Sequence, residues 1–262
     1  MDSRRMRRSD MNARGGGVLF VTLILALTAC GSGVHPAPTT PPATPGDPSH
    51  PQGIQYIWDL PPLAPIEPGT YFMDPDLDPA TPLRVLYEVP AEEWSQWVGA
   101  VKFGDEGHVA VSITTVVNLV RHGCNDHSRA DPPVGPTVDD LATALADLAP
   151  FRVTSPLRDV TVYGYDGRYL ELTVPDLPVE GSGDDRRFTG CIDGKLMSWV
   201  APFDTAPGDA FYGYSDSGYT EEFWILDVEA TRLVIAAERS PGSPQKDLDE
   251  LRAILDSIRI EP

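Results

Sequence analysis

The alternation of hydrophobic and polar residues predicts a series of short strands in the middle and C-terminal parts of the chain. Each run is rich in β-branched and aromatic residues and ends at proline, glycine or a polar cluster, which is typical of strands. A further run at 54–60, IQYIWDL, lies between prolines and suits an edge strand or a segment docked on a sheet. The predicted strands are 83–89, 97–103, 108–120, 160–165, 168–174, 195–201, 222–228 and 232–238.

Two pairs of these strands are separated by short polar segments and are predicted to form hairpins. Asp166-Gly167 stands between the strands at 160–165 and 168–174 and favours a type I′ turn. Glu229-Ala230-Thr231 connects the last two strands.

Two segments have the 3.6-residue hydrophobic period of amphipathic helices. The first begins at Thr137, where Asp140 three residues later completes a pattern close to a capping box. Its apolar residues recur from Val138 to Leu148 on one face. The second begins after Ser243, a good N-cap, with Pro244 in the first helical position. Its apolar stripe is Leu248, Leu251, Leu255 and Ile258.

Runs of strands interrupted by two amphipathic helices favour an α+β fold. We therefore expect a twisted antiparallel sheet with the two helices packed on it. Residues 54–262 form a single predicted domain, because no second linker interrupts them.

The first 29 residues have the pattern of a bacterial lipoprotein signal peptide. Five arginines precede a twelve-residue apolar stretch at 18–29, which spans only about 18 Å as a helix and is too short to cross a bilayer. The sequence Leu27-Thr28-Ala29-Cys30 resembles a lipobox, which implies that Cys30 carries a diacylglycerol group and begins the mature chain. An ordinary signal peptide with a chance cysteine is the alternative.

The segment 30–53 is predicted to be an acylated cysteine followed by a disordered tether. It is rich in proline and almost free of large apolar residues, so it cannot bury enough surface to offset the entropy of ordering. The chain should therefore lie on the extracytoplasmic face of the cell membrane, with its domain held away from the bilayer by a spacer.

The net charge of the chain argues against a protein that binds nucleic acid. The chain has 20 Lys+Arg against 39 Asp+Glu, a net charge of −19, which argues against a nucleic-acid partner. Removal of the signal peptide takes away five Arg and two Asp, so the mature chain has a net charge of −22. We expect a monomer that meets the membrane only through Cys30.

Six parts of the chain carry a resemblance to known sequences: 133–141, 162–175, Cys191, 223–228, 232–235 and the closing helix 248–258. They resemble a family of uncharacterised actinobacterial-type secreted lipoproteins. The resemblance implies a PsbP-like α/β/α arrangement and no transferable activity. At the last hairpin the family has Asp-Gly where this chain has Glu229-Ala230.

Two cysteines, Cys124 and Cys191, remain once Cys30 is assigned to the anchor. An oxidising compartment favours pairing them, and closing the long loop between them is worth roughly 4 kcal/mol in the chain-entropy model. We therefore predict a Cys124–Cys191 disulfide.

Neither of two metal-like patterns predicts a metal site. A polar loop around the disulfide explains the cluster His122, Cys124, Asp126 and His127 better than zinc does, because its spacing matches no standard zinc pattern. The Asp74-Pro-Asp76-Leu-Asp78 segment fails the EF-hand pattern at positions six and twelve, although a looser calcium site stays open. We predict no cofactor.

The sequence contains no catalytic motif that we can assign, so we predict no catalytic residues. The best candidates for ligand contact are Tyr212, Tyr214 and Tyr219, whose rings suit a sugar face or a partner side chain. The alternative is that these rings point into the core. The predicted function is a non-catalytic binding module of the cell envelope, with a lipid, glycan or protein ligand. An envelope hydrolase with an unrecognised carboxylate site is the other hypothesis.

Overall fold

The structure is a computed structural model that describes residues 54–78, 81–182, 185–202 and 211–262, except for the side chain of Phe211. These residues belong to a compact unit that spans Pro45–Pro262. The predictions for the signal peptide, Cys30 and the tether at 30–53 lie outside the described residues. None of the described helices combines the length and the apolar character needed to cross a membrane.

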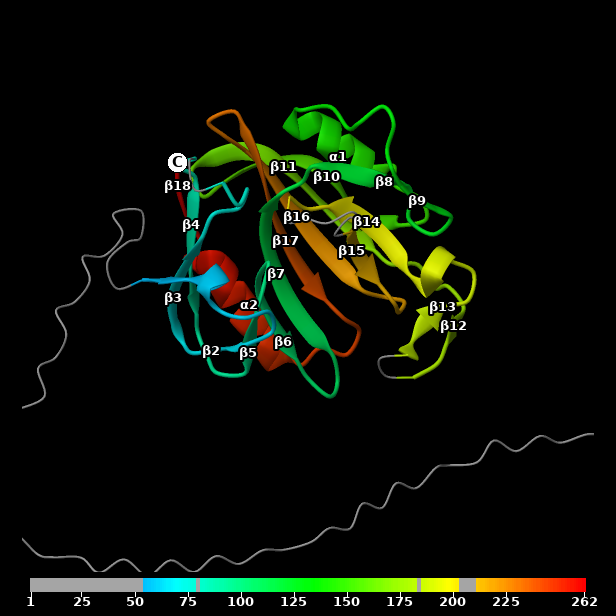
Figure 1. The fold of residues 1–262 in the computed structure, drawn as a ribbon, viewed down its shortest axis with the longest axis horizontal. Helices are drawn as coiled ribbons and strands as arrows, with labels where there is room; N and C mark the ends of the chain where they lie inside the picture. The colour runs from blue at the N-terminus through cyan, green and yellow to red at the C-terminus, as the bar shows by residue number, and fades with distance from the viewer. Residues whose placement is uncertain (1–53, 79–80, 183–184, 203–210) are drawn as a thin grey trace, which may run out of the picture. The chain divides into compact units, whose positions relative to one another are not determined.

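An eight-stranded antiparallel sheet forms the centre of the unit (Figure 1). The strand order places β7 beside β17 although more than a hundred residues separate them, with Ile113 opposite Ile235. In sheet order the strands are β10 (Arg152–Val162), β11 (Tyr165–Thr173), β16 (Thr220–Val228), β17 (Thr231–Arg239), β7 (His108–Thr115), β6 (Gly99–Phe103), β5 (Trp94–Trp97) and β2 (Pro65–Ile66).

One face of this sheet is covered by a helix and a second sheet. Helix α2 (Gln245–Ser257) packs there with Leu251, Ile254 and Leu255 buried. The second sheet is four-stranded and also supplies core residues to this face. Its strands, in order, are β1 (Gln55–Tyr56), β3 (Gly69–Met73), β4 (Arg84–Val89) and β18 (Arg259–Glu261).

The opposite face is covered by helix α1 (Val138–Ala146) and by a third sheet. Leu141 and Leu145 of α1 are fully buried against residues of β11, β16 and β17. A separate two-stranded sheet, β12 (Val179–Glu180) paired with β13 (Arg187–Phe188), lies past the third sheet, on the side away from the second sheet (Figure 1). The third sheet has the order β15 (Phe211–Tyr214), β14 (Leu196–Val200), β8 (Asn118–His122) and β9 (Asp126–Arg129).

The predicted disulfide between Cys124 and Cys191 is confirmed. The two residues are 67 positions apart in the chain, and their Cα atoms lie 4.5 Å from each other. Cys124 lies in the turn between β8 and β9, and Cys191 precedes the short 3-10 helix η3 (Ile192–Gly194). The bond therefore joins the third sheet to the segment that leads into β14.

The predicted α+β fold class, a single sheet with two helices packed on it, is wrong, because the described chain is mostly β. Both predicted helices form, but with 9 and 13 residues they are too short to cover the faces of eight strands. Additional sheets complete the cover on both faces, so layers of β-structure dominate (Figure 1). Period-two patterns identify strands but do not reveal how many sheets they form.

Two local details also differ from the sequence-based expectation. The β10–β11 turn is Tyr163-Gly164, with φ of 54° and 89°, while Asp166 and Gly167 lie inside β11. The hydroxyl of Ser243 does not cap α2, because it donates to the backbone oxygens of His108 and Ser240. The capping box of Thr137 and Asp140 on α1 is confirmed.

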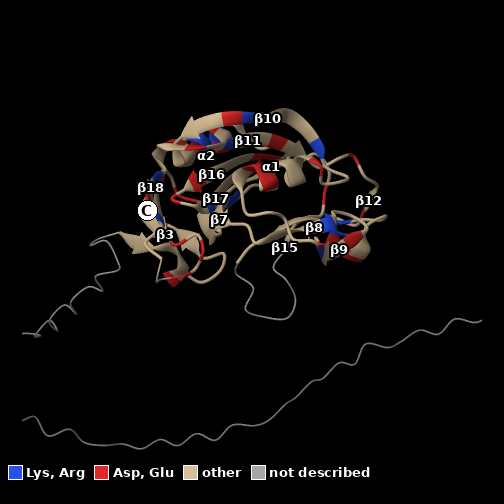
Figure 2. Cartoon of the chain, turned by 90° about the horizontal axis from the view of Figure 1, so that it is seen from above, with Lys and Arg blue, Asp and Glu red and all other residues tan. Residues whose placement is uncertain are grey.

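The acidic residues are spread over many elements of the described chain. Figure 2 shows Asp and Glu on strands, helices and loops, with Lys and Arg among them.

Candidate binding site

A pocket of about 380 Å³ lies where one end of the central sheet faces the third sheet. Val101, Phe103 and Ala110 extend along the central-sheet wall, and Gly213 and Ser215 flank the opposite wall. The side chains that give the pocket its chemical character are Trp97, Phe103, His108 and Glu238 from the central sheet, and Lys195, Met197, Tyr212, Tyr214 and Tyr219 on the other side.

The three tyrosines predicted as ligand contacts all line this pocket. Tyr212 and Tyr214 lie two residues apart on β15, and Tyr219 directly precedes β16. The ring centroid of Tyr214 lies 5.6 Å from that of Tyr212 and 5.9 Å from that of Tyr219. Tyr214 is buried, whereas Tyr212 and Tyr219 are half-buried. The rings therefore belong to the hydrophobic core and to the pocket wall at once.

These tyrosines belong to a longer row of aromatic side chains. At the inner end Tyr212 stacks on the buried Trp199, with 4.6 Å between ring centroids and 10° between ring planes. At the outer end Tyr219 lies 5.0 Å from the ring of His108, which lies 5.8 Å from Phe103. Phe103 is 60% exposed, so the row leads from the core to the surface.

Two glutamates lie directly opposite each other in the sheet behind the tyrosines. Glu221 on β16 pairs in register with Glu238 on β17, and the two residues are 3% and 5% exposed. The hydroxyl of Tyr214 donates to Oε2 of Glu221, and the hydroxyl of Tyr212 donates to Oε2 of Glu238 at 3.1 Å. Each tyrosine thus holds one carboxyl group of the pair.

The surroundings favour the neutral form of several of these groups. Burial, and then the charge of Glu238, raise the pKa of Glu221 well above its usual value of 4.5, against the weaker effects of Tyr214 and Trp199. Burial and the glutamate charges also raise the pKa values of Tyr212 and Tyr214 well above 10. These shifts favour the protonated form of Glu221, and both tyrosines stay uncharged at neutral pH.

His108 joins the aromatic row to the carboxyl pair. Its Nε2 lies 2.5 Å from Oε1 of Glu238, and its backbone N–H donates to Oγ of Ser240 at 2.6 Å. The two oxygens of Glu238 thus have partners from two strands, β7 and β15, which fix the carboxylate at the pocket wall.

The sequence analysis missed Glu221, Glu238 and His108. One pattern could have indicated the glutamates, because Glu221 continues the inward-facing positions of Phe223 and Ile225 on β16. Glu238 continues Val234 and Ala236 on β17 in the same way. A carboxylate at an inward-facing strand position is unusual and indicates a buried polar site.

The metal-like patterns of the sequence do not gather into a metal site, and no group of three or more potential ligands among the described residues has that arrangement. Cys124 is in the disulfide, and Nδ1 of His122 accepts hydrogen bonds from the backbone N–H groups of Cys124 and Asn125. Asp76 accepts hydrogen bonds from Thr81 and from the backbone of Asp78. These side chains stabilise turns.

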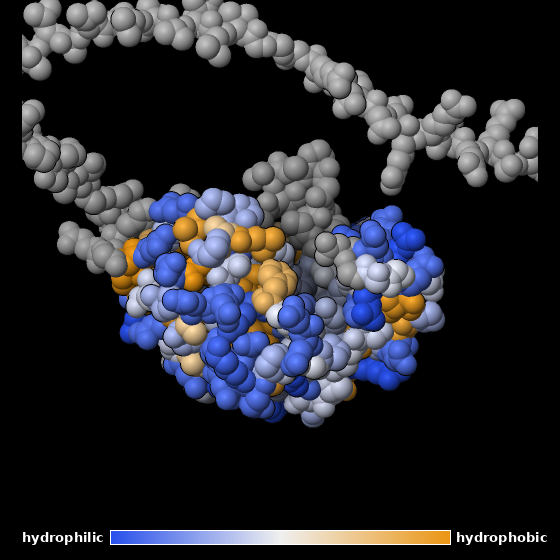
Figure 3. Space-filling model, turned by 90° about the horizontal axis from the view of Figure 1, so that it is seen from below, coloured by the Kyte–Doolittle hydropathy of each residue, from blue (hydrophilic) through white to orange (hydrophobic). Residues whose placement is uncertain are grey.

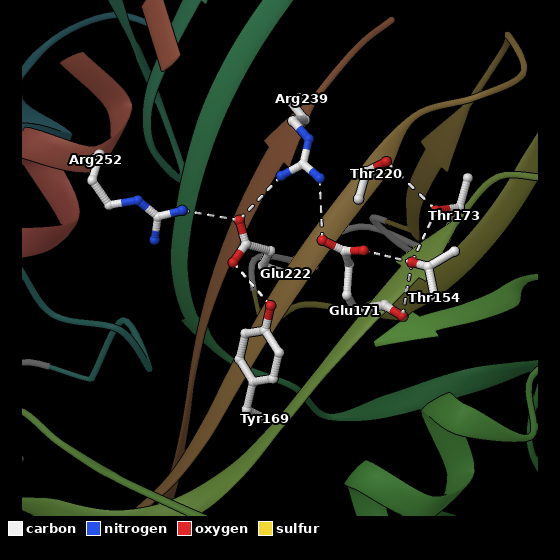
Figure 4. Close-up of polar contacts among 8 residues, drawn as sticks. All are labelled: Thr154, Tyr169, Glu171, Thr173, Thr220, Glu222, Arg239 and Arg252. Carbon is white, nitrogen blue, oxygen red and sulfur yellow. Dashed lines mark hydrogen bonds and ion pairs between the residues drawn. The ribbon is translucent and has the colours of Figure 1, made fainter. Parts of the chain in front are cut away.

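A second polar cluster lies on the opposite face of the central sheet, and its charged side chains pair with one another (Figure 4). Glu222 accepts hydrogen bonds from Tyr169, Arg239 and Arg252 at 3.0–3.3 Å. Glu171 accepts from Arg239 at 3.1 Å and from Thr154 at 2.6 Å. Because these charges pair with one another and join α2 to the sheet, we assign the cluster a structural role.

Comparison of the chain with protein-family models, with curated proteins and with solved structures finds no match. The resemblance to secreted lipoproteins therefore stays a prediction from the sequence. The pocket and its residues are therefore the basis of the functional assignment.

Proposed function

We propose that this protein is a lipid-anchored, extracytoplasmic binding module of the cell envelope, whose ligand occupies the pocket of Tyr212, Tyr214 and Tyr219. The observation that carries the proposal is the pocket's lining. Among the described lining residues, aromatic side chains from two sheets surround one carboxylate, Glu238, which is fixed by His108 and Tyr212. Small-molecule sites commonly combine apolar walls with a few oriented polar groups.

The same geometry argues against the alternative of a two-carboxylate hydrolase. Glycoside hydrolysis needs two carboxyl groups that flank the bond to be cleaved. Of the described residues that line the pocket, Glu238 is the one with a carboxylate. Glu221 is not among the residues that line the pocket, and Tyr214, which binds its Oε2, stands between it and the pocket. Binding without cleavage fits this arrangement better.

The anchoring part of the proposal is supported by the N-terminal sequence. Two acyl chains on Cys30 would hold the protein at the membrane stably, since two lipid groups suffice where one is marginal. The mature net charge of −22 would be repelled by an anionic lipid surface. The domain would then be held away from the lipid headgroups.

Native mass spectrometry of the full chain, purified from the envelope of the organism that encodes it, tests the binding function. We expect a bound mass that is lost on denaturation. Phe103→Ala should reduce its occupancy, because Phe103 is an exposed part of the pocket wall. Leu157→Ala is a matched control, since Leu157 is 36% exposed on the edge strand β10, away from the pocket. A bare chain mass in every preparation would contradict the proposal.

A further inference from the structure

We infer that the ligand of this pocket is a neutral saccharide, the terminal unit of an envelope glycan. This inference rests on the proposed binding function and names the ligand's class. Three features of the pocket lead to it: the balance of its charges, the exposed aromatic rings at its entrance and the hydrogen-bonding capacity left on Glu238.

Two charged side chains of opposite sign stand among the described residues that line the pocket. Glu238 contributes a negative charge and Lys195 a positive one, and both line the pocket. Glu221 is bound by the hydroxyl of Tyr214, and burial and the charge of Glu238 favour its neutral form. Lys195 therefore disfavours a cationic ligand, and Glu238 disfavours a carboxylate or phosphate, so the lining suits an uncharged ligand.

Aromatic rings with exposed faces stand at the entrance of the pocket. Trp97 is 36% exposed and Phe103 is 60% exposed, and both lie on the same face of the central sheet as His108. Figure 3, which shows the described surface from below, has hydrophobic area grouped beside hydrophilic area. Planar rings beside polar groups match a sugar, whose ring has an apolar face and a rim of hydroxyls.

The carboxylate of Glu238 retains acceptor capacity for ligand hydroxyls. A carboxylate has about four lone-pair sites. His108 occupies one on Oε1 and Tyr212 occupies one on Oε2. Because the two contacts hold the group in place, the remaining sites point in fixed directions, as selective recognition of a hydroxyl requires.

The same carboxylate disfavours an acyl chain in the pocket. An alkyl chain would cover the lone pairs of Glu238 that His108 and Tyr212 leave open without offering them a hydrogen bond, which is unfavourable beside a charged group. A ligand with hydroxyls replaces the lost water contacts, whereas an alkyl chain does not.

Isothermal titration of the full chain, solubilised in a zwitterionic detergent without a sugar headgroup, tests this inference. The probes are the neutral hexamers of glucose, mannose and N-acetylglucosamine, the deacetylated cationic glucosamine hexamer, hexagalacturonate and a fatty acid. We expect at least one neutral hexamer to bind with a Kd of about 1 mM or lower. It should bind more tightly than the charged oligomers and the fatty acid.

Three variants connect the binding to the pocket. Glu238→Gln and Phe103→Ala should each weaken binding of that hexamer about tenfold, whereas Leu157→Ala should leave it unchanged. Phe103 is largely exposed, so its variant keeps the test valid if Glu238→Gln fails to fold. Unchanged binding in Phe103→Ala would overturn the inference.

The failure of this inference differs from the failure of the proposed function. If native mass spectrometry shows a bound mass but no neutral hexamer binds at about 1 mM, the saccharide class is wrong and the binding module stands. The same conclusion follows if the bound mass is an amphiphile or if a charged oligomer binds most tightly. If neither a bound mass nor a binding probe is found, both are wrong.

Discussion

At the scale of single residues, Glu221 makes the stability of the protein depend on pH. Its pKa is higher in the folded chain than in the unfolded one, because burial and the charge of Glu238 disfavour ionisation. The stability it contributes is therefore complete below its unfolded pKa, near 4.5, and is lost as the pH rises towards the folded value. In this range the free energy of unfolding should fall by up to about 1.4 kcal/mol per pH unit.

Replacing Glu221 with glutamine removes the ionisable carboxyl group and, with it, this contribution to the pH dependence of the free energy of unfolding. We expect Glu221→Gln to gain stability relative to the native chain as the pH rises from 5 towards 9, because the amide cannot ionise. Urea unfolding at several pH values, followed by tryptophan fluorescence, measures the difference. Glu88→Gln, at an exposed position of β4, serves as control. A constant difference across the pH range would show that Glu221 ionises normally.

The turn between β16 and β17 contains two residues in a left-handed conformation. Glu229 and Ala230 have φ of 48° and 67°, and Val228 pairs directly with Thr231, so the turn is shorter than the predicted three residues. The double variant Glu229→Asn/Ala230→Gly should raise the free energy of unfolding by about 1 kcal/mol, since Asn-Gly suits a type I′ turn. Thermal unfolding measures it. Ala253→Gly, at an exposed position in helix α2, should instead lower the free energy of unfolding by about 1 kcal/mol.

At the scale of elements, Lys102 fastens helix α2 to the central sheet. It lies on β6, its side chain is 4% exposed, and its ammonium group is 2.9 Å from Asp247 and 2.8 Å from Glu250. Burial lowers the pKa of Lys102, but hydrogen bonds to Glu250 and Asp247 outweigh burial and raise it overall. The lysine therefore stays charged and compensates two carboxylates of the helix.

Lys102→Met should lower the free energy of unfolding by about 3 kcal/mol, because it removes the buried cation from Asp247 and leaves Glu250 with the exposed Lys246. Lys246→Met is the matched control, since Lys246 also pairs with Glu250 at 3.5 Å but is exposed. Lys246→Met should lower the free energy of unfolding by less than about 0.5 kcal/mol. Urea denaturation is the appropriate measurement, because guanidinium would screen the ion pairs. Equal losses in the two variants would contradict the fastening role.

The elements that the sequence predicted correctly are those whose cause is local. The N-terminus of α1 follows from Thr137 and Asp140, which lie three residues apart and cap the helix themselves. The hydroxyl of Ser243, by contrast, bonds to His108 on β7, a partner 135 residues away. The pairing of β7 with β17 has the same long range, so neither the cap nor the sheet order could be deduced from neighbouring residues.

At the scale of the whole molecule, the candidate site is built from segments that lie far apart in the chain. The sequence pointed to Tyr212, Tyr214 and Tyr219, which line the pocket, because the three residues lie within one short segment. Glu238 and His108 are 130 residues apart, and only the antiparallel pairing of their strands brings them together. The fold class was wrong for a related reason, since the number of sheets depends on such pairings and not on strand content.

We also predict that the whole molecule is anchored to a membrane through Cys30. If Cys30 carries a diacylglycerol group, the protein should sediment with membranes, because each buried methylene of an acyl chain contributes about 0.8 kcal/mol to membrane binding. Cys30→Ser removes the thiol that forms the lipid thioether. We expect the variant to lose metabolic labelling with palmitate, while the Cys124–Cys191 disulfide still forms.

Fractionation must separate loss of the lipid from loss of signal-peptide cleavage, because an uncleaved signal peptide would also hold the chain at the membrane. The N-terminal sequence or intact mass of the native protein decides this, since a mature chain that begins with a modified Cys30 requires both processing steps. Cys124→Ser/Cys191→Ser is the control that removes thiols without touching the anchor and should keep the palmitate label. Cleavage at another position, or a native chain without label, would show that Cys30 is an ordinary residue behind an ordinary signal peptide.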